Sequence, residues 1–249
     1  MNDRIGEERI NNFGSKMIVT NYRNYKDIDV YFPKYDYTKE HVGYGDFKKG
    51  EISCAYEPRV FGVACVGEGE YKVSKNGKCT KCYKTWNHML ERCYSKKFQE
   101  RNPTYIDCSV SEDWLNFQVF GKWFDENYYN IGEEVMSLDK DILMKGNKIY
   151  SPQTCVFVPQ RINLLFTKNN IVRGDSPIGV SYKNKKYKAY CNVDRKKKSL
   201  GYYDTPEEAF QAYKQYKEQY IKEVADQYKN VIPQKLYEAM IKYQVEIDD

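Results

Sequence analysis

Long apolar runs are missing from this sequence of 249 residues, and none approaches the roughly 18 residues that a membrane-spanning helix requires. No signal peptide precedes the first polar residues, so we expect a cytoplasmic protein with no membrane partner. Histidine is scarce as well, since His41 and His88 are the only two. The side chain that most often moves protons near neutral pH is therefore available at two positions, and for each a surface or core role is the simpler interpretation.

Cysteine occurs eight times, but not in a pattern typical of a structural zinc site. Cys79 and Cys82 form one Cys-x-x-Cys pair, whereas the spacings to Cys93 and Cys108 do not form a second pair. Zinc is therefore disfavoured as a cofactor. We expect buried, reduced thiols, because disulfides are rare in proteins of the cytosol.

Charge is plentiful and unevenly distributed. Charged residues make up 30% of the chain, and the net charge is +5. Residues 112–141 hold eight acids against two lysines, whereas residues 168–203 hold ten Lys or Arg residues against two Asp. An acidic segment followed by a basic one fits a metal site joined to a DNA-binding surface, and the length allows two or three modules.

Residues 137–163 show a pattern of strand, loop, strand and helix with oxygen-bearing side chains at both ends. Asp139 and Asp141 fall on the same side of the first strand, because strand side chains alternate. A hairpin of this length brings Asp139 and Asn163 over one spot. The predicted elements are a strand over residues 137–143, a turn at Gly146-Asn147, a strand over residues 155–158 and a short helix opened by Pro159.

The short motifs of this segment are Leu138-Asp139-Lys140, Gly146-Asn147, Tyr150-Ser151-Pro152, Cys155-Val156-Phe157 and Asn163. Their order resembles the HNH (His-Asn-His, or ββα-metal) nucleases, and in particular the phage homing-endonuclease branch. The resemblance implies hydrolysis of phosphodiester bonds in double-stranded DNA, with Asp139 and Asn163 as ligands of a divalent cation. Hard oxygen donors favour Mg²⁺ or Mn²⁺ over zinc.

Two positions depart from the HNH pattern. Lys140 stands where the family usually has a His that acts as general base, and Thr154 stands where an Asn is common. An ordinary lysine is a poor base, because its pKa is about 10.4. The base is then either a desolvated Lys140 or one of the two histidines. Alternatively, Asp141 orients the attacking water, or Asp139 and Asp141 both bind the metal. The catalytic candidates are Asp139, Lys140, Asp141 and Asn163.

A second pattern occupies the basic part of the chain. A helix is predicted with Thr205 as N-cap, Pro206 at its first position and Glu208 completing a capping box. Three short strands separated by polar turns precede it, over residues 178–182, 186–193 and 198–203.

The middle strand has two distinct faces. Tyr187, Ala189 and Cys191 face the helix, which leaves basic and polar side chains on the open face. The motifs Gly179-Val180, Tyr187-Lys188-Ala189, Leu200-Gly201-Tyr202 and Glu207-Glu208-Ala209 resemble the Apetala-type (AP2/ethylene-response-factor) DNA-binding domain. We expect the segment from about residue 175 to fold and bind DNA by itself. The resemblance implies contacts in the major groove of double-stranded DNA by Ser181, Lys183, Lys188, Tyr190, Asn192, Lys197 and Ser199.

Together these patterns predict an α+β protein of several modules. Before residue 137 the predicted elements are strands over residues 16–22 and 28–32 and helices over residues 81–94 and around Trp114 to Phe124. The leading hypothesis is a metal-dependent homing-type endonuclease. The alternatives are a DNA-binding or regulatory phage protein whose nuclease site has decayed, and a structural phage protein that needs neither metal nor DNA. The predicted modules are a β-rich module (residues 1–68), an HNH core (residues 80–167) and an Apetala-type domain with a helical tail (residues 176–249).

Overall fold

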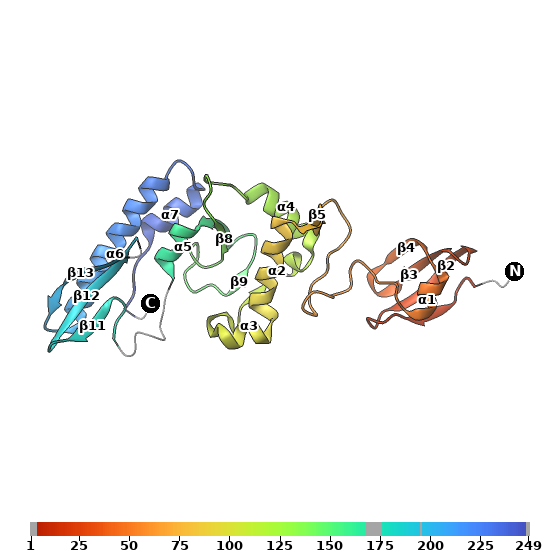
Figure 1. Ribbon diagram of the computed structural model, residues 1–249, viewed down its shortest axis with the longest axis horizontal. Helices are drawn as coiled ribbons and strands as arrows, with labels where there is room; N and C mark the ends of the chain where they lie inside the picture. Colours follow the sequence, from red (N-terminus) through yellow and green to blue (C-terminus); the bar gives the residue numbers. More distant parts are fainter. Residues whose placement is uncertain (1–3, 168–175, 195, 248–249) are drawn as a thin grey trace. The chain divides into compact units, whose positions relative to one another are not determined.

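The computed structural model describes residues 4–167, 176–194 and 196–247 (Figure 1). The fold is mixed α+β with several antiparallel sheets, as the sequence predicts. Within the described residues, no helix is both long and apolar enough to cross a membrane. The chain divides into two compact units, one made of Met1–Asn127 and Lys148–Pro152, the other of Tyr128–Asn147 and Gln153–Asp249.

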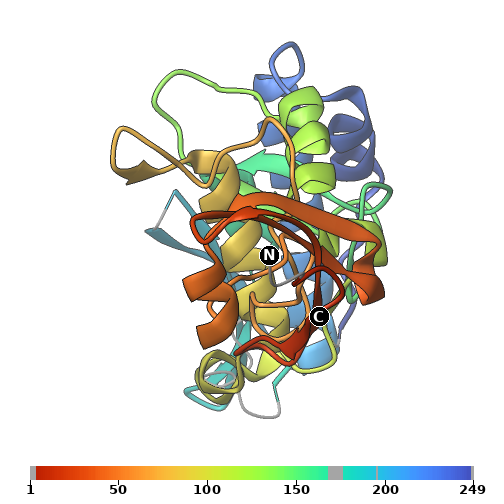
Figure 2. The ribbon, with the colours of Figure 1, turned by 90° about the vertical axis from the view of Figure 1, so that its right-hand side faces the viewer.

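The first unit begins with a four-stranded antiparallel sheet in the order β1-β2-β3-β4. The helix α1 (Tyr44–Lys49) packs on this sheet through Phe47, which is buried with Met17 and Val30 (Figure 2). Two of the strands were predicted, and the short, exposed β1 and the polar β4 were not, because neither carries a clear apolar alternation. The strands are β1 (Glu8–Ile10), β2 (Lys16–Asn24), β3 (Asp27–Phe32) and β4 (Tyr37–Val42).

Helices and short strand pairs form the rest of the first unit. The Thr80 side chain caps α2 by accepting from Tyr83 N at 3.2 Å, and α2 spans the predicted residues 81–94. Trp114 was expected on the same helix as Phe117, but it lies in a separate 3-10 turn. Asn116 between them has an extended backbone, and its Oδ1 accepts from Gln118 N at 2.9 Å. The elements are η1 (Pro33–Tyr35), β5 (Ser74–Lys75), β6 (Lys78–Cys79), α2 (Lys81–Tyr94), α3 (Lys96–Arg101), η2 (Pro103–Tyr105), β7 (Ser109–Val110), η3 (Glu112–Leu115), α4 (Phe117–Asn127) and β9 (Ile149–Tyr150).

The second unit contains a ββα arrangement. β8 (Met136–Asp139) pairs antiparallel with β10 (Val156–Pro159), and α5 (Gln160–Phe166) follows directly. The first strand was predicted to run to residue 143, but it ends at Asp139. Asp139 Oδ1 accepts from the backbone N of Asp141 at 2.9 Å and of Ile142 at 2.8 Å, and these bonds turn the chain out of the strand.

A three-stranded antiparallel sheet and two helices complete the second unit. The Thr205 side chain accepts from Glu208 N, and the Glu208 carboxylate accepts from Thr205 N, which confirms the predicted capping box of α6. Val180, Ala189 and Cys191 of the sheet are buried against this helix. The elements are β11 (Val180–Lys183), β12 (Lys186–Val193), β13 (Lys196–Tyr203), α6 (Pro206–Tyr228) and α7 (Gln234–Lys242).

The helix α6 takes part in two hydrophobic cores. Its first half packs on the sheet β11–β13. Its second half carries Ile221 and Val224, which are buried with Val156 and Val158 of β10 and Ile162 of α5. The boundary between the two units falls inside the predicted HNH core of residues 80–167. Residues 128–147 and 153–167 of that core share a compact unit with the predicted Apetala-type domain, whereas residues 80–127 and 148–152 belong to the first unit.

Candidate functional site

Two carboxyl groups meet where β8 ends. Asp139 Oδ1 accepts from the backbone N of Asp141, so the two acidic residues are in contact and the negative charge of Asp141 acts on Asp139. Burial and the charge of Asp141 raise the pKa of Asp139 to about 6, although the two backbone N–H groups that it accepts act in the opposite direction. A pair of like charges in a partly buried position is stabilised by a proton or by a cation. The two acidic residues are therefore suited to binding a cation.

Lys140 lies between these two acids in the sequence and is 8% exposed. Its Nζ donates to Asp141 Oδ2 and to the carbonyl oxygen of Asn147, both at 3.0 Å. In return, Asn147 Nδ2 donates to the Lys140 carbonyl at 2.7 Å. Lys140 Nζ acts as a hydrogen-bond donor in both contacts. In this arrangement Lys140 braces the loop of residues 140–147.

Asn163 lies in the first turns of α5, on the helix that follows the partner strand of β8, and it is partly buried. Its carbonyl accepts from Thr167 Oγ1 at 3.2 Å. Among the described residues, its side-chain amide forms no hydrogen bond with Asp139 or Asp141. The structure thus brings Lys140 into contact with the Asp141 carboxylate and Asp139 into contact with the Asp141 backbone, and among the described residues it does not join the Asn163 side chain to them.

The donor set of this site fits a hard divalent cation. Asp139 and Asp141 offer carboxylate oxygens, which are ligands that Mg²⁺ and Mn²⁺ prefer. The amide oxygen of Asn163 on α5 is a ligand of the same class, and no contact joins it to either acid among the described residues. A cation also relieves the repulsion that raises the pKa of Asp139. The ion pair between Lys140 and Asp141 competes with it for one oxygen.

Another cluster of potential ligands, Asp27, Asp29 and His41, lies in the N-terminal sheet. The Arg23 guanidinium already pairs with both carboxylates, at 2.9 Å from Asp27 Oδ1 and 2.7 Å from Asp29 Oδ2. This pairing lowers the pKa of Asp29 to about 2. The Arg23 guanidinium thus already supplies the positive charge that a metal ion would bring to this cluster. In the part of the chain that the structure describes, the cysteines form no comparable cluster with other ligands.

Both histidines belong to the first unit. His41 lies in β4 with a positive φ of 54° and contacts Asp27 at 2.9 Å. His88 lies on the exposed side of α2. The second unit, which holds Asp139, contains no histidine in its sequence. Within that unit, the remaining candidate for orienting water is Asp141.

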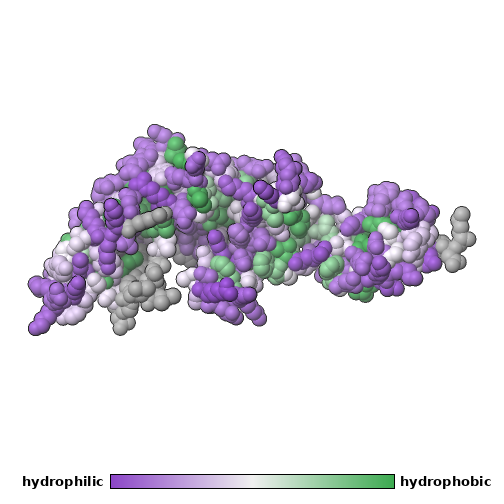
Figure 3. All heavy atoms as spheres, in the orientation of Figure 1, coloured by the Kyte–Doolittle hydropathy of each residue, from purple (hydrophilic) through white to green (hydrophobic). Residues whose placement is uncertain are grey.

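The outer face of the sheet β11–β13 carries all seven residues predicted for it. The strand register places Ser181 opposite Lys188, Tyr190 opposite Ser199 and Asn192 opposite Lys197, and Lys183 follows Ser181 by two. Side chains of opposed residues share a face, and the other face holds the residues buried against α6. Hydrophilic residues cover the end of the sheet where the hairpin β11–β12 turns, at the left of Figure 3. We call this surface the outer face.

Tyr202 also belongs to the outer face, and the sequence analysis missed it. It lies opposite Lys188, is 52% exposed, and its ring centre is 5.6 Å from Lys188 Nζ. Strict alternation from Ser199 would have placed Gly201 there instead. The register shifts next to Ala189, so β13 contains one extra residue at this point. A glycine followed by two aromatics is a signal that can mark such a bulge.

Lysine side chains lie over aromatic rings on this surface. Lys197 Nζ is 3.4 Å from the ring centre of Tyr190. Such contacts hold the ammonium groups near flat side chains, where both are available to a nucleic acid. Lys186, next to the turn between β11 and β12, pairs with Asp204 at 2.7 Å and is less available.

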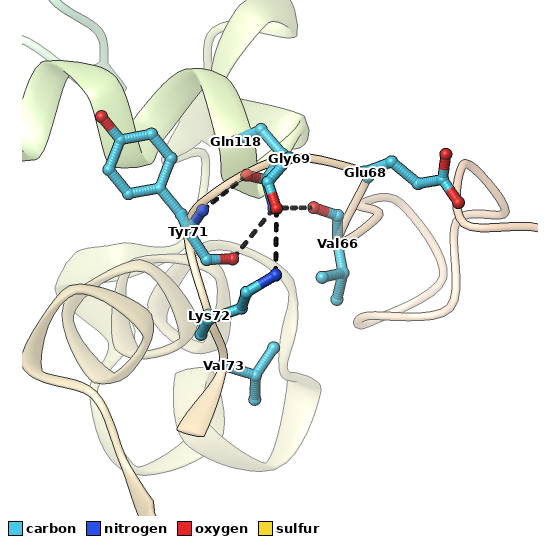
Figure 4. A pocket seen from close by; sticks show the side chains of 8 residues that line it. Val66, Glu68, Gly69, Tyr71, Lys72, Val73 and Gln118 are labelled. Atoms are coloured by element: carbon cyan, nitrogen blue, oxygen red, sulfur yellow. Dashed lines mark hydrogen bonds between the residues drawn. The ribbon is translucent and has the colours of Figure 1, made fainter. Parts of the chain in front are cut away.

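A hollow of about 440 Å³ lies in the first unit, where the segment from Val66 to Val73 meets α4 (Figure 4). Gln118 of α4 crosses it. Its Nε2 donates to the carbonyls of Val66 at 3.2 Å and Tyr71 at 3.1 Å, and its Oε1 accepts from Tyr71 N at 3.0 Å. One side chain thus satisfies three backbone groups and ties this segment to the helix, which gives the hollow a structural explanation.

Comparison with protein-family models, with curated proteins and with solved structures found no match for this chain. The functional conclusion therefore depends on the chemistry of the residues described above.

Proposed function

We propose that this chain is an HNH-type, metal-dependent DNA endonuclease. The observation that carries the proposal is the ββα arrangement of β8, β10 and α5, with Asp139 and Asp141 where β8 ends and Asp139 Oδ1 bonded to the backbone N of Asp141. It is supported by the basic, aromatic outer face in the same compact unit. Phosphodiester hydrolysis needs charge stabilisation and an oriented water, and carboxylate-held cations are a common means to both.

Each residue of the site has a distinct role in this proposal. Asp139 and Asn163 hold Mg²⁺ or Mn²⁺, which when bound supplies positive charge to the phosphate that is cut. Asp141 completes the ligand set or orients the attacking water. Lys140 fixes the loop and holds Asp141 in place through the 3.0 Å contact.

The outer face is proposed to bind double-stranded DNA. Lys183, Lys188 and Lys197 neutralise phosphates, whereas Tyr190 and Asn192 reach base edges in the groove. Tyr202 joins this set because it lies opposite Lys188.

One observation favours a second candidate function, a DNA-binding protein that no longer cuts. The Lys140 ammonium is already paired with Asp141, and a resident positive charge weakens the attraction for a cation. In such a protein the outer face binds DNA, and the acid pair has only a structural role.

Incubation of the purified protein with supercoiled plasmid tests both functions. We expect nicked or linear products with Mg²⁺ or Mn²⁺ and none with EDTA. The variants Asp139→Ala and Asn163→Ala should lose cleavage by at least about a hundredfold while keeping DNA affinity within about twofold, because they leave the outer face intact. Asp226→Asn, an exposed acid on α6, is the matched control and should cut like the wild type.

The two functions predict different results in that experiment. Wild-type protein that binds DNA but yields no products with either metal would identify the non-cutting function. Asp139→Ala cutting at the wild-type rate would show that the site is wrongly assigned.

A further inference from the structure

One long helix joins the candidate metal site to the outer face. α6 has 23 residues, which span about 35 Å at about 1.5 Å per residue. Its first half packs on the sheet through Phe210 and Tyr213. Its second half packs on β10 and α5 through Ile221 and Val224 (Figure 1). The ββα arrangement with the candidate metal site and the sheet with the outer face therefore both pack on α6.

A network of side chains also connects α5, α6 and the sheet. We call this network the bracket, and it consists of Arg161, Asp194, Tyr220, Gln227 and Tyr228. Arg161 Nε of α5 pairs with Asp194 Oδ1, in the turn between β12 and β13, at 3.4 Å. The same oxygen accepts from the Tyr220 hydroxyl of α6 at 3.2 Å. Arg161 Nη1 donates to Gln227 Oε1 at 2.9 Å, and its guanidinium lies 5.9 Å from the ring centre of Tyr228. One guanidinium thus contacts α6 and the sheet turn from its position on α5.

The bracket also reaches the two segments that carry the candidate ligands. Arg161 precedes Asn163 by two residues on α5. The Tyr228 hydroxyl donates to Glu134 Oε1 at 2.8 Å, and Glu134 lies just before β8, which ends at Asp139. A tilt of the sheet relative to α5 must therefore break contacts that also orient these segments.

We infer that Arg161 is a positioning residue which, together with Asp194, holds DNA on the outer face at one fixed offset from the bond that is cut. The inference rests on the proposed endonuclease function. A single helix fixes the distance between two surfaces, but a sheet packed on one helix can still tilt. Asp194 opposes the tilt because its carboxylate contacts both Arg161 of α5 and the Tyr220 hydroxyl of α6.

The test compares the cut positions of full-length variants on plasmid DNA, mapped by sequencing of the product ends. Arg161→Gln and Asp194→Asn each break the ion pair, and Asn tolerates the positive φ of the turn. We expect the wild type to cut each site at one bond and both variants to spread the ends over several neighbouring bonds, with DNA affinity within about threefold of the wild type. Glu218→Gln, which breaks an ion pair within α6 alone, should keep the wild-type pattern.

A second measurement reads the geometry without cleavage. Spin labels at Leu164→Cys on α5 and Lys183→Cys on β11, both exposed positions, report the distance between the two surfaces in a Cys79→Ser background. A narrow distance distribution that broadens in Arg161→Gln supports the positioning role.

The outcomes separate the inference from the function on which it rests. Unchanged cut positions together with an unchanged distance distribution in both variants would overturn the positioning role. If only Arg161→Gln changes the pattern, Arg161 contacts DNA directly, and the bracket is likewise rejected. If the wild type cuts no DNA, the endonuclease function fails and the distance distribution alone decides, since broadening supports the bracket and an unchanged width rejects it.

Discussion

At the scale of single residues, the ionisation of Asp139 has a cost that can be measured. Its pKa is about 6 in the folded protein, compared with an ordinary value of 3.8. Below about pH 4 the carboxyl is protonated in both states and has no effect. As the pH rises towards 6 the unfolded chain ionises first, so the folded state loses stability, by up to about 3 kcal/mol before a discount for partial exposure.

We therefore expect Asp139→Asn to stabilise the metal-free protein at high pH. The amide oxygen of Asn still accepts the two backbone N–H groups, while the repulsion with Asp141 disappears. In the presence of EDTA the melting temperature of the transition that reports the second unit should rise by about 3 to 8 °C at pH 8 and by about a third as much at pH 4.5. Circular dichroism at both pH values measures this.

Asp204→Asn is the control for this experiment, because the Asp204 side chain is 78% exposed. It should leave the melting temperature nearly unchanged at both pH values. A fall in melting temperature of Asp139→Asn at pH 8 would mean that the carboxylate is better satisfied than the acid pair implies.

Gly179 is a second residue whose identity the structure explains. Its φ is +74°, and a Cβ there would collide with the Tyr213 ring. Gly146 has a similar φ of +80° but open space around it. We expect Gly179→Ala to lower the free energy of unfolding by about 2 to 4 kcal/mol, as strain and overpacking add. Gly146→Ala should cost only about 1 kcal/mol. Urea denaturation measures the difference, and equal losses would argue against the collision.

At the scale of elements, local signals predicted most of the secondary structure. The stripe of Trp86, Met89 and Leu90 marked α2, and Thr205 with Glu208 marked the start of α6, because periodicity and capping act within a few residues. The end of β8 was missed, since the Asp139 side chain competes with the strand for backbone N–H groups. The same competition brings the carboxyl of Asp139 to Asp141, so the acid pair was predicted for the wrong reason.

The outer face was predicted better than the acid pair, because period two determines the face of every strand residue. The exception was Tyr202, which the bulge in β13 moves to this face. A bulge depends on how two strands pair, and a single strand contains little of that information.

We expect three lysines of the outer face to control the salt dependence of DNA binding. Changing Lys183, Lys188 and Lys197 together to Gln should weaken binding and reduce the slope of log K against log salt by about 0.9 for each lost phosphate contact. Fluorescence anisotropy with a labelled duplex at several salt concentrations gives the slope.

The matched control removes the same charge from the exposed Lys222, Lys229 and Lys242 on α6, its C-terminal end and α7. This triple variant should lose less of the slope, because those lysines lie away from the sheet strands. Equal losses for the two triple variants would indicate non-specific attraction to the whole protein and not binding at the outer face.

At the scale of the whole molecule, the second unit has two cores on one helix. The sequence motifs predicted two separate modules with a boundary near residue 176, because each motif covers only a short segment of the chain. The second half of α6 packs on α7 and also on β10 and α5, and the motifs of the sheet give no indication of this packing. The structure therefore argues against the expectation that a segment from about residue 175 folds by itself.

We expect a fragment of residues 128–249 to fold and a fragment of residues 175–249 to fail. Removing β10 and α5 uncovers the parts of Ile221, Val224 and Leu236 that α6 and α7 do not cover themselves, and all three are fully buried in the chain. Full exposure costs about 1.5 to 3 kcal/mol for each side chain, so half of it for all three costs about 2 to 4.5 kcal/mol, a large part of the stability of a small domain. Circular dichroism and urea denaturation of both fragments test this. A control fragment of residues 175–249 with Ile221→Gln and Val224→Gln should be more soluble but no more folded. If the unmodified shorter fragment unfolds cooperatively, the sheet and α6 form a domain that does not require the ββα arrangement.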